Sequence, residues 1–267
     1  PDTAYSFESG GDPADIPNLT YEKFLEFHRT YYHPSNSYIY LYGDLNMEEK
    51  LSWIDQEYLS SFDRIQTDSS IGLQKGFSEI VTKTKEYSIT NEEPLEDNTY
   101  LSYNLVIDTS LNRELYLAFQ IIEYALLAAP GAPLKQALLD RKIGKDIMST
   151  YENGVYQPYF SVIAKNANRS DLNAFLDTIR EVLQDIVKKG MDQKALLAGI
   201  NYYEFRYREA DYGSYPKGLM YGLQAYDSWL YDETKPFMHI EELETFALIK
   251  SNVDSGYFEE LIQKYLT

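Results

Sequence analysis

The sequence predicts an α+β fold in which helices pack on one face of an antiparallel β-sheet. Short segments with β-branched or alternating apolar residues predict strands, and longer segments with apolar residues at helical spacing predict helices. From about residue 78 these elements follow the order β-β-α-α-β-β-α-α-α, which favours antiparallel pairing. The chain has 267 residues, 44% of them hydrophobic, and is expected to fold throughout as more than one domain.

The chain should begin with a surface loop, a helix and a strand. Residues 1–19 carry Gly-Gly, Asp-Pro and Ile-Pro pairs, which predict a loop. Thr20 can cap a helix over 20–32, whose aromatic residues recur at helical spacing, so one face should be buried. The β-forming residues of 38–42 are apolar on both sides, which predicts a central strand.

A second helix and a linker should follow. Asn46 can cap a helix that runs to about Phe62, and the acids Glu48 and Glu49 in its first turn suit the helix dipole. The sequence then becomes polar and loses its periodicity over 63–77. We interpret this stretch as a linker between two domains.

Two strands and two helices are expected after the linker. Residues 78–90 have β-branched side chains on one side, and 99–108 alternate between apolar and polar residues. A largely apolar helix over 112–129 should be buried in the core. A shorter helix is expected after Pro130-Gly131-Ala132-Pro133, through about Arg141.

A β-hairpin is predicted next. Asn153-Gly154 lies between strand-like segments at 147–152 and 155–164, which predicts a tight two-residue turn. Pro158 cannot donate a hydrogen bond to a neighbouring strand, so its strand should lie at a sheet edge or contain a bulge.

The rest of the chain should be helical. Ser170 can cap a helix that ends at Gly190, and Asp192 can cap the next one. A further helix is expected around 217–231, and two more from Glu241 to the end.

Composition excludes several functional classes. A formal net charge of −18 repels phosphate backbones, so we expect no nucleic-acid partner and find basic peptides more plausible. The chain has no Cys, which fits a reducing compartment, and we expect a cytoplasmic protein. The longest apolar stretch is interrupted by Gln120 and Glu123, so no membrane span is expected. The chain starts at Pro1 without a signal sequence, which suggests a segment of a longer protein.

Catalytic and metal-binding motifs are not evident. A helical zinc pair needs two His four residues apart, but His28 and His33 are five apart and His239 is remote. Neither a G-x-S-x-G nucleophile motif nor a phosphate-binding P-loop occurs. Adjacent acidic residues are interpreted as solvated helix surface. We therefore assign no catalytic and no metal-ligating residue to the chain.

Two groups of motifs carry a resemblance to a known family. The first lies near the start of the chain and comprises Ser9-Gly10-Gly11-Asp12-Pro13, Ile16-Pro17-Asn18-Leu19-Thr20, Phe27-His28, Tyr31-Tyr32-His33-Pro34-Ser35-Asn36 and Tyr42-Gly43-Asp44. The second comprises residues 208–219 followed by Trp229-Leu230-Tyr231-Asp232. Together they resemble the presequence-protease branch of the pitrilysin/insulinase zinc metallopeptidases, the M16 family.

The resemblance implies a parent enzyme of two halves, each with two domains of the M16 peptidase-like, LuxS-like metallohydrolase fold. Residues 1–62 would be the C-terminal part of the first, catalytic domain without its zinc motif. Residues 63–77 would be the linker, and residues 78–267 the second, non-catalytic domain. Zinc would be held in the full-length parent by an H-x-x-E-H motif and a later Glu upstream of this chain, and no cofactor is expected here.

The resemblance also implies candidate substrate-binding residues. Some relatives anchor the N-terminus of a peptide on the second domain by β-strand addition, using a glycine-bearing segment and a nearby strand. The similar positions here are Gly131, Tyr151 and Glu152. The alternative is that these residues have structural roles only, with Gly131 in a turn between helices and Tyr151 packing within its strand.

The function implied is that of a segment of a zinc-dependent metalloendopeptidase that degrades short unfolded peptides. The segment alone should be inactive, supply scaffold and a wall of the substrate chamber, and contact the remaining domains of its parent chain. One alternative is a non-catalytic structural or partner protein of the same fold. Another is a stand-alone peptide-binding module, which would require residues 1–62 to fold alone.

Overall fold

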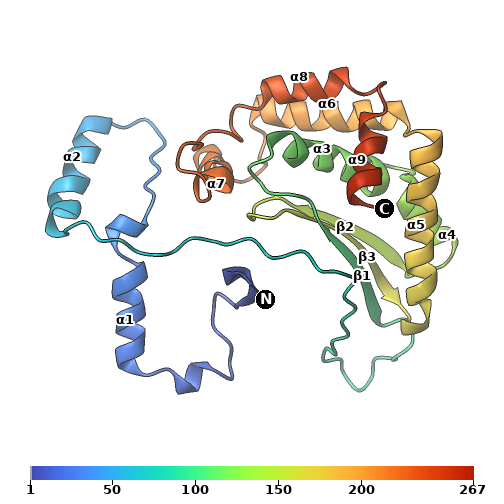
Figure 1. The fold of residues 1–267 in the computed structure, drawn as a ribbon, viewed down its shortest axis with the longest axis horizontal. Coiled ribbons are helices and arrows are strands. Elements are labelled where there is room, and N and C mark those ends of the chain that lie inside the picture. Colours follow the sequence, from blue (N-terminus) through green and yellow to red (C-terminus); the bar gives the residue numbers. More distant parts are fainter. Residues whose placement is uncertain (1) are drawn as a thin grey trace. The chain divides into compact units, whose positions relative to one another are not determined.

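The structure is a computed structural model that describes residues 2–267 (Figure 1). It forms two compact units, Pro1–Gly76 and Phe77–Thr267. The boundary falls at the end of the stretch interpreted as a linker. Whether the two units correspond to the first and second domains of the parent enzyme stays a prediction.

Both expected helices of the first unit form, α1 at Tyr21–Tyr31 and α2 at Met47–Glu57. Their N-caps are as predicted: the Thr20 hydroxyl accepts a backbone N–H at 3.3 Å, and the Asn46 side chain accepts another at 3.2 Å. Helix α2 ends earlier than expected, because a separate 3₁₀ turn follows it. The 3₁₀ turns of this unit are Ala4–Ser6, Ile16–Asn18, Pro34–Asn36 and Leu59–Ser61.

Two predictions for the first unit are wrong. None of residues 2–76 is buried, and the side chains of Phe24 and Phe27 on α1 are 55% and 58% exposed. The predicted central strand at 38–42 does not form. The physical reason is the same for both: a helix face needs an element to pack against, and a strand needs a neighbour for its backbone N–H and C=O groups.

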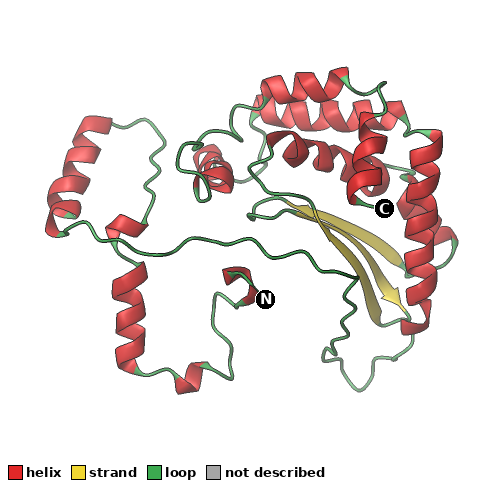
Figure 2. Ribbon diagram, in the orientation of Figure 1, coloured by secondary structure: helices red, strands yellow, loops and turns green. Residues whose placement is uncertain are grey.

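The second unit contains a three-stranded antiparallel sheet with the strand order β1-β3-β2. The strands are β1 (Thr99–Val106), β2 (Asp146–Glu152) and β3 (Tyr159–Ala167). This arrangement confirms the predicted fold class (Figure 2). The strand expected at 78–90 does not form, because its β-branched residues have no paired neighbour in the described chain.

The β2–β3 hairpin forms as predicted, but its turn differs. Glu152 pairs with Tyr159, so the loop spans 153–158 rather than two residues. Pro158 lies just before the central strand, so an edge position for that strand is wrong. The alternative, a bulge, matches a register shift at the other end of β3, where Thr99 pairs with Ala167 and Leu101 with Ala164. The carbonyl of Pro158 accepts a hydrogen bond from Ile107 N–H at 2.7 Å. Because proline has no N–H, the return bond from residue 158 to Ile107 is not made.

The helices of the second unit match most of the expectations. Asp192 caps α6, as predicted, but Asn168 rather than Ser170 caps the 3₁₀ turn at Arg169–Asp171 that leads into α5. The helices are α3 (Arg113–Glu123), continued by a π-helical turn at Tyr124–Ala128, α4 (Pro133–Asp140), α5 (Leu172–Lys189), α6 (Gln193–Glu209), α7 (Lys217–Trp229), α8 (Leu243–Ser251) and α9 (Tyr257–Tyr265).

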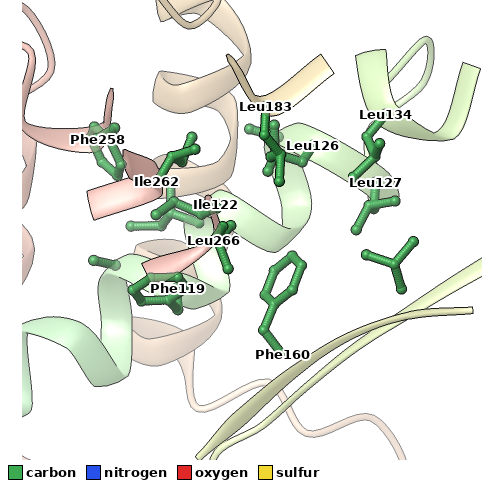
Figure 3. Close-up of a cluster of buried hydrophobic side chains, with 14 of the residues drawn as sticks. Phe119, Ile122, Leu126, Leu127, Leu134, Phe160, Leu183, Phe258, Ile262 and Leu266 are labelled. Carbon is green, nitrogen blue, oxygen red and sulfur yellow. The ribbon is translucent and has the colours of Figure 1, made fainter. Parts of the chain in front are cut away.

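The core lies between one face of the sheet and the helices above it. Helices α3, α4 and α5 contact the sheet, α9 packs against α5, and α6 and α8 pack on the outer side of α3 (Figures 1 and 2). Phe119 of α3 contacts Phe160 of β3 and Tyr265 of α9, with ring centroids 6.3 Å and 5.6 Å apart. Figure 3 shows side chains from these elements converging on this cluster.

One helical stretch, Arg113–Asp140, is long and apolar enough to cross a membrane by length and composition alone. Of its apolar window, 61% is buried inside the protein. Because the core helix of a globular protein passes the same test, we draw no inference about a membrane from it.

Candidate functional site

Strand β2 lies at an edge of the sheet, since β3 is its single neighbour among the strands of the described residues. An edge strand presents backbone N–H and C=O groups that can pair with an added strand. Two of the candidate residues, Tyr151 and Glu152, are the last residues of this strand. Strand addition at β2 stays a prediction, and the strand order agrees with it.

The side chain of Tyr151 packs into the core. Its ring centroid lies 5.8 Å from that of Phe119, and its hydroxyl donates to the backbone oxygen of Leu115 at 3.4 Å. Burial raises the pKa of Tyr151 above its usual value. Any role in strand addition therefore belongs to the backbone of β2 and not to this side chain.

Glu152 lies where β2 ends and its side chain is half-buried. Its Oε1 accepts a hydrogen bond from Gly154 N–H at 3.1 Å. A Cβ atom on Gly154 would lie 3.2 Å from this oxygen and 3.5 Å from Oδ1 of Asp227. The carboxylates of Glu152 and Asp227, which are far apart in the sequence, therefore lie close together at the end of β2.

Gly131 is not brought together with the other two candidates. It has a φ of +73°, and nothing lies within 4 Å of where its Cβ would be. One helical turn later, Lys135 Nζ lies 3.6 Å from Oδ1 of Asp146, the first residue of β2. These contacts put the Gly131 segment towards the start of β2, whereas Tyr151 lies near its other end.

A buried polar cluster adjoins the end of β2. The hydroxyl of Tyr116 donates to Oδ2 of Asp227 at 2.8 Å, and its ring stacks on His239 with centroids 3.7 Å apart. Nδ1 of His239 lies 3.1 Å from Oε1 of Glu242. Burial raises the pKa of Asp227 to about 6, and the hydrogen bond from Tyr116 opposes this shift.

Arg113 completes the cluster from the first turn of α3. Its Nε lies 3.2 Å from Oε2 of Glu242, whose side chain is 1% exposed, and its Nη2 donates to the backbone oxygen of Met238 at 2.7 Å. Sequence reasoning missed this cluster because residues 113, 116, 227, 239 and 242 have no spacing motif in common. Only folding brings them together.

The described residues do not fit a zinc ion. Residues 2–267 contain no group of three or more His, Asp or Glu side chains that could hold a metal. His28 stacks on Tyr32 with ring centroids 4.8 Å apart, and Nδ1 of His33 accepts from Ser35 N–H at 3.1 Å. Each of these His residues thus has a local structural contact.

A family model described as "Peptidase M16 inactive domain" matches residues 18–203, which include all three candidate residues. The chain belongs to the M16 peptidase family. The resemblance described from the sequence motifs is confirmed by this match.

Similar proteins include "Protein HypA" of Clostridium perfringens, which is 45% identical over 100% of this chain and 27% of its own length. "Presequence protease 1, chloroplastic/mitochondrial" of Arabidopsis thaliana is 33% identical over 100% of this chain and 25% of its own length. The chain thus spans about a quarter of the length of these curated relatives.

Solved structures show the same fold at low identity. An M16-like peptidase from Alicyclobacillus acidocaldarius superposes with a TM-score of 0.57 at 16% identity, over 98% of this chain and 59% of the other. A protease from Helicobacter pylori superposes with a TM-score of 0.64 at 14% identity, over 96% of this chain and 59% of the other. At these identities the likeness concerns the fold alone.

Proposed function

We propose that this chain is a segment of a zinc-dependent metalloendopeptidase that degrades short unfolded peptides, in which it supplies scaffold and a wall of the substrate chamber. The observation that carries the proposal is the edge strand β2 in a chain that belongs to a peptidase family. In this proposal the segment supplies no catalytic group, and its role in the parent enzyme is to bind and orient the peptide.

Strand addition would select for unfolded substrates. A peptide lying along β2 would exchange backbone hydrogen bonds with the strand, which a folded substrate has already used internally. These bonds do not depend on the sequence of the peptide, so one edge can accept many substrates. The carboxylates of Glu152 and Asp227 at the end of the strand would favour a positively charged group there.

The first unit supports a role inside a larger chain. Its helices expose large apolar side chains, among them Phe24, Phe27, Leu51 and Trp53. Exposed apolar side chains at helical spacing mark a face that another element covers. We propose that the remaining domains of the parent chain cover these faces and complete the catalytic domain.

Zinc belongs in this proposal only to the full-length parent, where it would activate a water molecule for attack on the peptide bond. Its ligands would come from outside this chain, because the described residues hold no group that fits a metal. Removing zinc should therefore abolish cleavage by the parent and leave peptide binding to β2 unchanged.

The test uses backbone-methylated peptides. In an added strand only alternate N–H groups bond to the neighbour, so single N-methylation along an unfolded peptide should weaken binding to the 267-residue chain at every second position. Fluorescence anisotropy with singly methylated peptides would measure this, and the intervening positions serve as controls. Equal affinity for all the peptides would show that strand addition does not occur.

A structural or partner protein of the same fold is the second candidate. It is favoured by the match of residues 18–203 to a family model described as an inactive domain. Metal analysis and peptide cleavage by the whole parent protein separate the two, because a structural partner would contain no zinc and cleave nothing. A cytoplasmic location, proposed from the lack of Cys, is checked by cell fractionation.

A further inference from the structure

A cavity lies where α6 ends and α7 begins. Its volume is about 360 Å³, and both of these helices and the loop between them contribute to it. It is lined by Phe205, Glu209, Ala210, Asp211, Tyr212, Gly213, Tyr215 and Lys217. No residue of the proposed peptide edge takes part in it.

Aromatic rings form much of the wall. Phe205 and Tyr215 are 61% and 64% exposed, so their rings are open to a ligand. Tyr212 is held in place, because its hydroxyl lies 3.1 Å from Oε1 of Gln224 and its ring meets Tyr221 edge to face. The faces of such rings carry negative electrostatic potential and attract cations.

Two carboxylates of the cavity, those of Glu209 and Asp211, are not paired with a basic side chain in the described part of the chain. Neither Glu209 nor Asp211 takes part in an ion pair among the described residues. Asp211 accepts only a backbone bond here, from Gly213 N–H at 3.1 Å. The cavity also lies at the C-terminal end of α6, where the helix dipole favours positive charge.

The neighbouring basic side chains are engaged elsewhere. Arg208 lies 2.6 Å from Oε1 of Glu204, and Arg206 lies over the ring of Tyr202. Lys217 is the one basic residue that lines the cavity, and its Nζ donates to the backbone oxygen of Glu209 at 3.2 Å. The carboxylates are thus left for a cation supplied from outside.

We propose that this cavity binds the guanidinium group of an arginine side chain in an unfolded peptide. A guanidinium is planar, so it stacks on aromatic rings while its N–H groups donate to carboxylates, a combination that the more strongly hydrated ammonium of lysine makes less well. That the arginine belongs to a peptide rests on the proposed function. The preference of the cavity for a guanidinium does not.

Small ligands test the charge preference. N-acetylarginine amide is titrated into the 267-residue chain by calorimetry or NMR, with N-acetylcitrulline amide as its neutral isostere. The arginine compound should bind and shift the signals of the loop at 210–215, and the citrulline compound should not. Equal binding of the two compounds, or no binding of either, would overturn the proposal.

Surface variants test the location. Glu209→Gln combined with Asp211→Asn should weaken binding by about tenfold or more, whereas Lys217→Gln should strengthen it by removing a like charge. Glu244→Gln, on an exposed position of α8 outside the cavity lining, removes one surface charge as a control and should change nothing. Circular dichroism verifies the fold of each variant, and an unchanged affinity in the double variant would exclude this cavity.

The source of the arginine is tested separately. A peptide with a central arginine should bind at least as tightly as N-acetylarginine amide, because both present an uncharged backbone. Free arginine binding far more tightly than either would mean that the site serves a free amino acid. Loss of strand addition in the methylated-peptide experiment would leave these results unaffected, so the failure of one proposal is distinguishable from that of the other.

Discussion

The hydroxyl of Tyr116 donates a hydrogen bond to Oδ2 of Asp227 at 2.8 Å and thereby ties α3 to α7. Tyr116 is buried and Asp227 is partly buried, and the ring of Tyr116 also stacks on His239. A hydrogen bond to a buried carboxylate is stronger than one between neutral groups. The pair is therefore a sensitive point for the stability of the second unit.

Replacing Tyr116 by Phe keeps the ring and removes the hydroxyl. We expect a loss of about 1.5–3 kcal/mol in the free energy of unfolding at pH 8, because the Asp227 carboxylate loses its charged hydrogen bond. Urea unfolding followed by fluorescence measures this. Tyr159→Phe, on an exposed residue of β3, is the control and should have little effect.

Asp227 should make stability depend on pH. Its pKa is raised from 3.8 to about 6, so the folded state binds a proton that the unfolded state releases, and stability falls as pH rises from about 4 through about 6. The full cost should be about 3 kcal/mol and should be complete above about pH 7. Urea unfolding of Asp227→Asn between pH 4 and pH 8 should lack this loss, and an unchanged profile would contradict the assignment.

Replacing only one residue of the Arg113–Glu242 ion pair should lower the free energy of unfolding. Arg113→Met should destabilise by about 3 kcal/mol, because it leaves the buried carboxylate of Glu242 with His239 but without its cationic partner. Replacing both residues by Met should recover much of that loss. A double-mutant cycle measures the coupling, and the exposed pair of Arg180 with Asp177 should give less than about 1 kcal/mol as a comparison.

Two glycines with positive φ should tolerate Ala differently. Gly131→Ala should cost about 1 kcal/mol, because the backbone conformation is strained for an L residue but nothing lies near the new Cβ. Gly144→Ala should cost clearly more, because its Cβ would lie 2.8 Å from the backbone oxygen of Lys165. Thermal unfolding of both variants gives the order, and a reversed order would contradict this account.

Motif resemblance predicted part of the candidate site at β2. Resemblance singled out Gly131, Tyr151 and Glu152, and the structure places two of them at the end of an edge strand. That the side chain of Tyr151 packs against Phe119 was open until the fold was known, because alternation along a strand does not say which face meets the helices. The separation of Gly131 from the other two also depended on how α3 runs along β2.

Local chemistry in the sequence determined where most helices begin and what class of fold results. Thr20, Asn46 and Asp192 cap their helices as predicted, because a side-chain acceptor followed by an apolar period acts over only a few residues. Tertiary structure decided what depends on a distant partner. The segments at 38–42 and 78–90 have strand composition but no paired neighbour. The bond between Tyr116 and Asp227 joins residues 111 positions apart, and no local pattern encodes such a contact, because only packing of the whole core brings the two side chains together.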